Sequence, residues 1–190
     1  MKKIVLFASG SGSNVENIVT HFKGNPTVSV ALVLTNRPNA FVLERCKRLG
    51  VPAMYFNRDA FFESNVVLNL LQSLNPHLIV LAGFLWKIPK NWVETFPKKI
   101  INIHPALLPK YGGKGMYGDH IHKAVKENGE TETGITIHYV NEHYDKGSII
   151  TQEKVALEEL DTPQHIAEKI HQLEYDHFPK TIEKLLSGHG

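Results

Sequence analysis

The sequence predicts an α/β fold built on a doubly wound, mostly parallel β-sheet with an antiparallel edge. In the first half of the chain, short apolar runs of strand length alternate with segments whose apolar residues recur at helical spacing. The first apolar run passes directly into a glycine-rich loop and then a helical pattern. After Gly129 the pattern changes to strict alternation, which is typical of paired antiparallel strands.

Composition places the chain among ordinary globular proteins. Of its 190 residues, 42% are hydrophobic and 21% are charged, so disordered and fibrous classes are excluded. This length suffices for one sizeable core, and we expect residues 1–190 to form one domain. A formal net charge of +2 gives no reason to expect a nucleic acid or a membrane as partner.

Targeting and redox signals are sparse. Cys46 is the only cysteine, so no intramolecular disulfide can form, which fits a reducing compartment. Lys2 and Lys3 precede an apolar run that is too short for a signal peptide and that meets Gly10 at once. We therefore expect a cytoplasmic protein, either a monomer or a homodimer.

The amino-terminal unit is a strand, a glycine loop and a helix. Residues 1–8 read as a strand that is buried on both faces, and Val15 begins the helical pattern. Free amide groups and the helix dipole would meet at the loop between them, which favours an anion. The loop is not a Walker loop, and it lacks the third glycine of the dinucleotide fingerprint, so the unit is Rossmann-like only. Ser13 or Asn14 could also serve simply as a helix cap.

The next elements continue the alternation. A strand over 28–35 is followed by a helix over about 40–49 that Gly50 closes, and then by a short strand over 52–56. Arg58 and Asp59 open one long helix whose apolar residues recur through Leu74, with Asp59 as its cap. A buried strand over 78–82 ends at Gly83.

The strand that begins at Ile100 carries the densest polar signal. Its β-branched residues bracket Asn102, and the strand ends at His104 and Pro105. Side chains two apart on a strand share a face and lie roughly 6.6 Å apart, so Asn102 and His104 can address one small group. An amide donor beside an imidazole suits a carbonyl that becomes an oxyanion while a nucleophile loses a proton. A lone asparagine and histidine before a turn can also be structural.

The rest of the chain reads as helix, hairpin and helix. A glycine-rich loop leads into a helix over about 119–128, where His120 and His122 are separated by two positions and lack the further ligands of a metal site, so we predict no metal. Strands over 134–140 and 148–157 form an antiparallel pair joined by a polar turn. Asp161, Thr162 and Pro163 begin the closing helix.

The segment Asn102–Pro109, NIHPALLP, resembles the N-x-H-P-[SA]-L-L-P signature of the folate-dependent formyltransferases, and it matches at all eight positions. The resemblance covers nearly the whole chain. It implies the formyltransferase fold, 10-formyltetrahydrofolate as cosubstrate and no metal. Within the family, the chain is similar to the branch that formylates glycinamide ribonucleotide, because sister branches carry an additional domain.

The resemblance also implies roles for individual residues. It assigns catalysis to Asn102, His104 and Asp145, with the aspartate as partner of the histidine. Trp86 and Lys87 depart from the Met-Arg-Ile-Leu type of run that many relatives have, and His171 stands where relatives often have glutamine. The implied ribonucleotide contacts are Gly12, Ser13, Asn14, Pro105 and Glu174, and the implied folate contacts are Leu85, Trp86, Ile88, Val140, Glu142 and Tyr144.

Other functions remain open from the residues alone. A sugar-nucleotide N-formyltransferase is the nearest enzyme alternative. A nucleotide-binding sensor on the same sheet would need no Asn102 and His104 pair, and an oxidoreductase would be expected to carry the full glycine fingerprint. Phe84 and Trp86 could line a pterin pocket or could only pack their loop.

Overall fold

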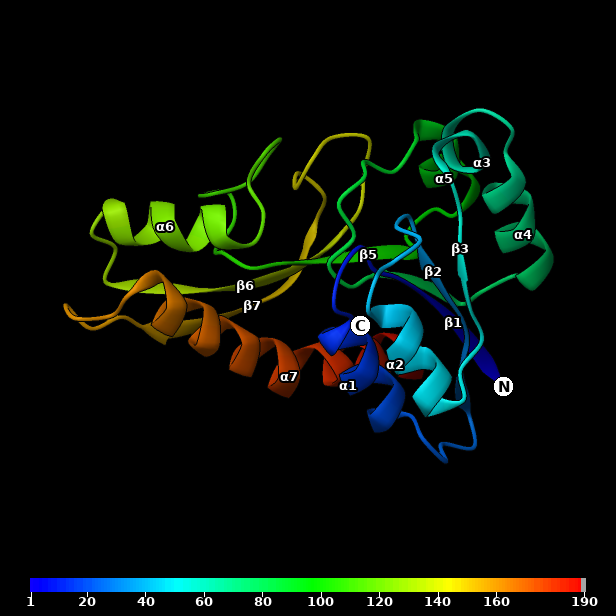
Figure 1. The fold of residues 1–190 in the computed structure, drawn as a ribbon, viewed down its shortest axis with the longest axis horizontal. Coiled ribbons are helices and arrows are strands. Elements are labelled where there is room, and N and C mark those ends of the chain that lie inside the picture. The colour runs from blue at the N-terminus through cyan, green and yellow to red at the C-terminus, as the bar shows by residue number, and fades with distance from the viewer. Residues whose placement is uncertain (189–190) are drawn as a thin grey trace.

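The computed structural model describes residues 1–188 and contains a seven-stranded sheet in the order β3-β2-β1-β4-β5-β6-β7 (Figure 1). The first five strands along the chain run parallel, and β6 and β7 add an antiparallel edge next to β5. This confirms the expected fold class. The strands are β1 (Lys2–Phe7), β2 (Val28–Thr35), β3 (Ala53–Tyr55), β4 (Leu78–Leu81), β5 (Ile100–His104), β6 (Glu132–Tyr139) and β7 (Ile149–Ala156).

Two apolar layers cover the two faces of the sheet. One layer joins alternate residues of the strands to α1, α2, α6 and α7, and the other joins the remaining strand residues to α3, α4 and α5. Figure 1 shows the second group gathered at one end of the molecule. The helices are α1 (Ser13–His21), α2 (Val42–Leu49), α3 (Arg58–Phe62), α4 (Val66–Leu74), α5 (Lys90–Thr95), α6 (Asp119–Glu127) and α7 (Pro163–Ser187).

The long helix expected from Arg58 to Leu74 is wrong, because the chain forms α3 and α4 instead. Asn65 lies between them with φ 54°, a left-handed conformation that an α-helix cannot continue through. Asp59 is not the cap either. The side chain of Asn57 accepts from the Ala60 N–H at 2.9 Å and caps α3.

The order in which the chain adds strands to the sheet reverses between β1 and β4. The chain runs outward through β2 and β3 and then returns to place β4 on the other side of β1. Ligands of open α/β sheets bind beyond the carboxyl ends of the strands at such a switch point. The loops after β1, β4 and β5 all emerge there, as the alternation of strands and helices predicted.

No helix within residues 1–188 is both long enough and apolar enough to cross a membrane.

Candidate active site

A cavity of about 580 Å³ lies at the carboxyl ends of β1, β4 and β5. It is of the size that small-molecule ligands occupy. Its walls come from parts of the chain that are far apart in sequence, and they bring together most of the residues singled out above. Those on the wall are Gly12, Ser13, Asn14, Leu85, Asn102, His104, Pro105, Tyr144, Asp145 and Glu174.

Asn102 and His104 lie on one face of β5, and the neighbouring strand β6 places a residue opposite each of them. In the antiparallel register, Asn102 is opposite His138 and His104 is opposite Thr136. Thr136 Oγ1 donates to the Ala106 carbonyl at 2.7 Å and accepts from the Leu108 N–H at 3.0 Å. The turn that follows the two polar residues is therefore fixed by a side chain of the neighbouring strand.

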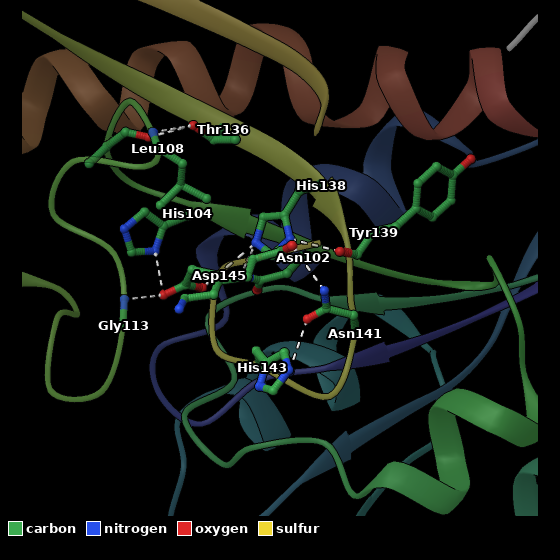
Figure 2. A network of polar contacts seen from close by, with 12 residues as sticks. Asn102, His104, Leu108, Gly113, Thr136, His138, Tyr139, Asn141, His143 and Asp145 are labelled. Carbon is green, nitrogen blue, oxygen red and sulfur yellow. Dashed lines mark hydrogen bonds and ion pairs between the residues drawn. The ribbon is translucent and has the colours of Figure 1, made fainter. Parts of the chain in front are cut away.

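His104 is buried, and a backbone carbonyl group accepts a hydrogen bond from one nitrogen of its ring. Its Nε2 lies 2.7 Å from the Tyr111 carbonyl oxygen, and since a carbonyl only accepts, Nε2 carries the proton and donates. Its Nδ1 lies 3.7 Å from Asp145 Oδ2, which is beyond direct hydrogen-bond distance (Figure 2). Burial lowers the pKa of His104 below 6.5, although the Asp145 charge and the Tyr111 carbonyl act to raise it.

The Asp145 carboxylate by itself would favour a charged His104, but burial of the imidazole acts against this charge. The carboxylate does favour the imidazolium form, but loss of hydration at a side chain with 5% exposure outweighs it. In its resting form, His104 is therefore poised toward the neutral imidazole. A neutral imidazole beside a carboxylate can take up a proton during a reaction and be stabilised once it is charged.

Asp145 lies between two histidines and at the end of a loop hydrogen bond. Its Oδ2 accepts from the Gly113 N–H at 2.9 Å, and its Oδ1 lies 3.7 Å from His138 Nε2. Burial opposes ionisation of the carboxyl group, but the neighbouring imidazoles of His138 and His104 and the Gly113 N–H together hold its pKa below the ordinary 3.8. Asp145 is accordingly a carboxylate at neutral pH.

The loop after β1 presents backbone amides to the cavity. Gly12 is the N-cap of α1 with φ 75°, and no side chain of the described chain caps this helix, so neither Ser13 nor Asn14 is the cap. The amide N–H groups of the first turn are therefore not used by side chains, and they lie at the positive end of the α1 dipole. Such a helix start is an anion-binding arrangement.

A polar chain from α7 completes this end of the cavity. The side chain of Asn14 donates from Nδ2 to Glu174 Oε2 at 2.8 Å, and His171 Nδ1 lies 3.1 Å from the same oxygen. The contact with Glu174 raises the pKa of His171 and outweighs the effect of burial. Within residues 1–188, Asn14 Oδ1 is buried without a hydrogen-bond partner, so this residue keeps an unused acceptor.

The expected folate contacts fall into two groups. Leu85 and Tyr144 line the cavity from opposite loops, and the Leu85 N–H donates to Ser9 Oγ at 3.0 Å. The other four expected contacts are not on its wall: Trp86, Ile88, Val140 and Glu142.

Packing explains where two of those four side chains lie. Ile88 is 3% exposed and belongs to the apolar layer with α5. Trp86 packs against Phe56, Phe61 and Phe62, with ring centroids between 5.5 and 6.0 Å apart. These contacts favour the packing alternative for Trp86.

Sequence reasoning missed His138 and Thr136, and it assigned no role to Tyr111 or Gly113, whose backbone groups contact His104 and Asp145. The segment over 134–140 was interpreted only as an edge strand, although its period of two places 136 and 138 on one face. His120 and His122 lie on α6, and residues 1–188 contain no group of three side chains arranged to hold a metal ion.

Comparisons of sequence and of structure relate this chain to known proteins. A family model described as formyl transferase matches residues 2–182. The phosphoribosylglycinamide formyltransferase of Bacillus subtilis is 38% identical over 98% of this chain and 95% of its own. A chloroplastic relative of the same name from Arabidopsis thaliana is 40% identical over 89% of this chain, which spans 60% of that longer protein.

A solved structure gives the same result in three dimensions. The crystal structure of phosphoribosylglycinamide formyltransferase from Bacillus halodurans superposes with a TM-score of 0.88 at 34% identity, covering 100% of this chain and 97% of the other. With the cavity, the Asn102–His104 pair and the amide loop in the same molecule, the chain belongs to the formyl transferase family, in the branch of the phosphoribosylglycinamide formyltransferases.

Proposed function

We propose that this protein transfers a formyl group from 10-formyltetrahydrofolate to the amino group of glycinamide ribonucleotide, a step of purine biosynthesis. The observation that carries the proposal is one continuous cavity in which an amide, an imidazole and a carboxylate stand next to a helix start suited to a phosphate. A sugar-nucleotide formyltransferase or a nucleotide sensor is less well supported, because the named relatives carry the ribonucleotide activity.

The chemistry follows from the groups on the cavity wall. The acceptor amine attacks the formyl carbon, and the carbonyl oxygen becomes an oxyanion that Asn102 stabilises through an amide N–H. The bond between the formyl carbon and the folate nitrogen then breaks, the amine loses a proton and the folate nitrogen gains one. His104 assists the proton movement, and Asp145 stabilises the imidazolium while it exists.

The two substrates occupy different ends of the cavity in this proposal. The phosphate of the acceptor rests on the amides of Gly12, Ser13 and Asn14, and Glu174 faces its sugar. The pterin ring lies between segments 85–88 and 140–145, which combine apolar side chains with backbone polar groups. Amide hydrogen exchange should slow in both segments when a folate analogue is added, and exchange that is unchanged in either would remove that segment from the pocket.

The reaction itself is tested by following folate release from 10-formyltetrahydrofolate with a panel of amine acceptors. Turnover with glycinamide ribonucleotide, and not with amino sugars of nucleotides, supports the proposal. Binding of glycinamide ribonucleotide with no formyl transfer would favour a nucleotide sensor instead. Nucleotide binding without turnover in the wild type would therefore refute the enzymatic assignment.

The catalytic unit is tested by a double-mutant comparison. If Asp145 acts through His104, the losses of kcat in His104→Ala and Asp145→Asn should not multiply, because each removes the same device. Each single loss should be on the order of 10²–10⁴, with the double variant close to the poorer single. Fully multiplicative losses, measured at saturating substrates, would show that the two residues act independently.

We further propose a cytoplasmic enzyme in which residues 1–190 work as one domain, as a monomer or a homodimer. The buried position of Cys46 is consistent with a chain that forms no disulfide. Sedimentation of the purified protein over a range of concentrations measures the oligomeric state directly.

A further inference from the structure

His138 is buried beneath the active site and makes contacts that the catalytic scheme above does not use. Its side chain is 2% exposed and it does not line the cavity, so it is not placed to touch a substrate. It nevertheless lies within 3.1 Å of Asn102 Nδ2 and 3.7 Å of Asp145 Oδ1. Both groups face the same ring atom, Nε2, and the other ring nitrogen is directed to Tyr139 (Figure 2).

A contact with the backbone of Tyr139 fixes the tautomer of the His138 ring. His138 Nδ1 lies 2.9 Å from the Tyr139 carbonyl oxygen, which can only accept a hydrogen bond. Nδ1 must therefore carry a proton and donate. In the neutral ring this leaves Nε2 with a lone pair, so the atom within hydrogen-bond distance of it has to be a donor.

This tautomer in turn fixes the orientation of the Asn102 amide, which contacts Nε2. Because Nε2 of the neutral ring accepts, the NH₂ group of Asn102, and not its oxygen, must face His138. One of the two amide protons is used in this bond. The other remains on the same nitrogen at a residue that lines the cavity, where it can point to an oxyanion. With the opposite orientation, the amide would present an oxygen to the developing negative charge.

Strand pairing holds the two side chains in this relation. Asn102 and His138 are directly opposite in the antiparallel pair of β5 and β6, so their side chains leave the sheet on the same face and within a few ångströms. Both strands are central, because β4 and β7 lie outside them. The contact is therefore a consequence of sheet register and needs no loop to close.

We propose that His138 is a positioning residue whose Nε2 lone pair sets the orientation of the Asn102 amide and so keeps an N–H directed at the reacting carbonyl oxygen. This rests on the proposed function for its kinetic consequence, but the hydrogen-bond geometry itself does not depend on the reaction. Asp145 Oδ1 faces the same Nε2 at 3.7 Å, which is beyond direct hydrogen-bond distance, so the contact at 3.1 Å with Asn102 is the one that Nε2 makes.

Two substitutions separate this role from simple packing. His138→Phe keeps the ring and the burial but removes the acceptor, whereas His138→Gln places an amide oxygen near the position of Nε2. Loss of one oxyanion donor costs on the order of 10²–10³ in kcat, and a freely turning amide should lose part of that, about 10–100-fold. We expect that loss in His138→Phe with both KM values nearly unchanged, and recovery to within about threefold in His138→Gln.

The loss should also depend on Asn102. In an Asn102→Ala background there is no amide to orient, so His138→Phe should lower kcat by no more than about twofold further. An equal loss in both backgrounds, wild-type kcat in His138→Phe, or a loss in His138→Gln as large as in His138→Phe would each overturn the proposal. Circular dichroism and thermal unfolding of each variant establish that it is folded.

A measurement on the unsubstituted protein needs no variant to fold. Side-chain ¹⁵N NMR, recorded under conditions in which the His138 ring is neutral, should show the ring protonated on Nδ1 and bare on Nε2. A His138 that carries its proton on Nε2 would overturn the proposal. Failure of the wild type to transfer formyl would refute the proposed function alone, since the tautomer is read without any substrate.

Discussion

Gly12 offers a direct test of how the phosphate loop is built. Its φ of 75° is in the left-handed region, and an added Cβ would lie 2.4 Å from Val42 Cγ2 and 2.6 Å from Val42 Cβ. Gly12→Ala therefore meets two penalties. The left-handed backbone costs roughly 1–2 kcal/mol, and overpacking against α2 costs roughly 1–3 kcal/mol.

The sum is a loss of about 2–5 kcal/mol in the free energy of unfolding, a large part of the roughly 5–15 kcal/mol of a typical domain. For a chain of this size we expect the Tm to fall by about 4–20 °C. The contact between the added Cβ and Val42 can be relieved only if the loop or α2 moves. The amides of the first turn of α1 then move as well. The KM for the ribonucleotide should then rise more than the KM for the folate.

Gly10→Ala is the matched control, since Gly10 lines the same cavity, has no positive φ and has no described atom within 4 Å of its added Cβ. Its Tm should stay within a few degrees of wild type. Gly12→Ala combined with Val42→Ala should recover only part of the loss, because the backbone strain and the Cβ contact remain. A wild-type Tm and an unchanged ribonucleotide KM in Gly12→Ala would refute this account of the loop.

Three further outcomes follow from the charges around the cavity. Asp145→Asn removes the carboxylate that raises the pKa of His104, so an NMR titration should show this pKa falling further below 6.5, and a rise would contradict the assignment. Glu174→Gln should return the pKa of His171 toward 6.5 and raise the ribonucleotide KM, whereas an unchanged His171 titration would show that the two are not coupled. Burial lowers the pKa of His122, whose Nδ1 has no partner within residues 1–188. A histidine whose pKa is lower in the folded than in the unfolded state contributes a loss of stability as pH falls below about 6.5. Denaturant unfolding of His122→Leu should therefore show a weaker loss between pH 7 and 5.5, and an equal loss would exclude His122 as its source.

The hydrophobic pattern of the sequence was sufficient to predict those elements in which buried and exposed positions follow one another regularly. The buried strands β1 and β4 contain continuous apolar runs because helices cover both faces of the sheet. Asn102 and His104 share a face because strand geometry has a period of two. Their spacing alone placed them together, without knowledge of what lies beside them.

Other features depend on contacts that no local pattern records. The break between α3 and α4 depends on the backbone angle of Asn65, which sits in a sequence of unbroken helical spacing. The short helix α5 buries only Trp92 among its six residues, too little for a periodic signal. The place of His138 depends on the register between β5 and β6, and the pKa of His104 on burial by distant segments.

The hydrogen bond between Asn14 and Glu174 joins residues that are 160 positions apart. The amino-terminal loop is therefore synthesised early, but the residue that faces it across the cavity is added to the chain only when α7 is being made. The other four segments that line the cavity, near residues 85, 104, 116 and 145, precede α7 in the chain. During synthesis, the ribonucleotide end of the cavity is consequently the last part of the active site that can be completed.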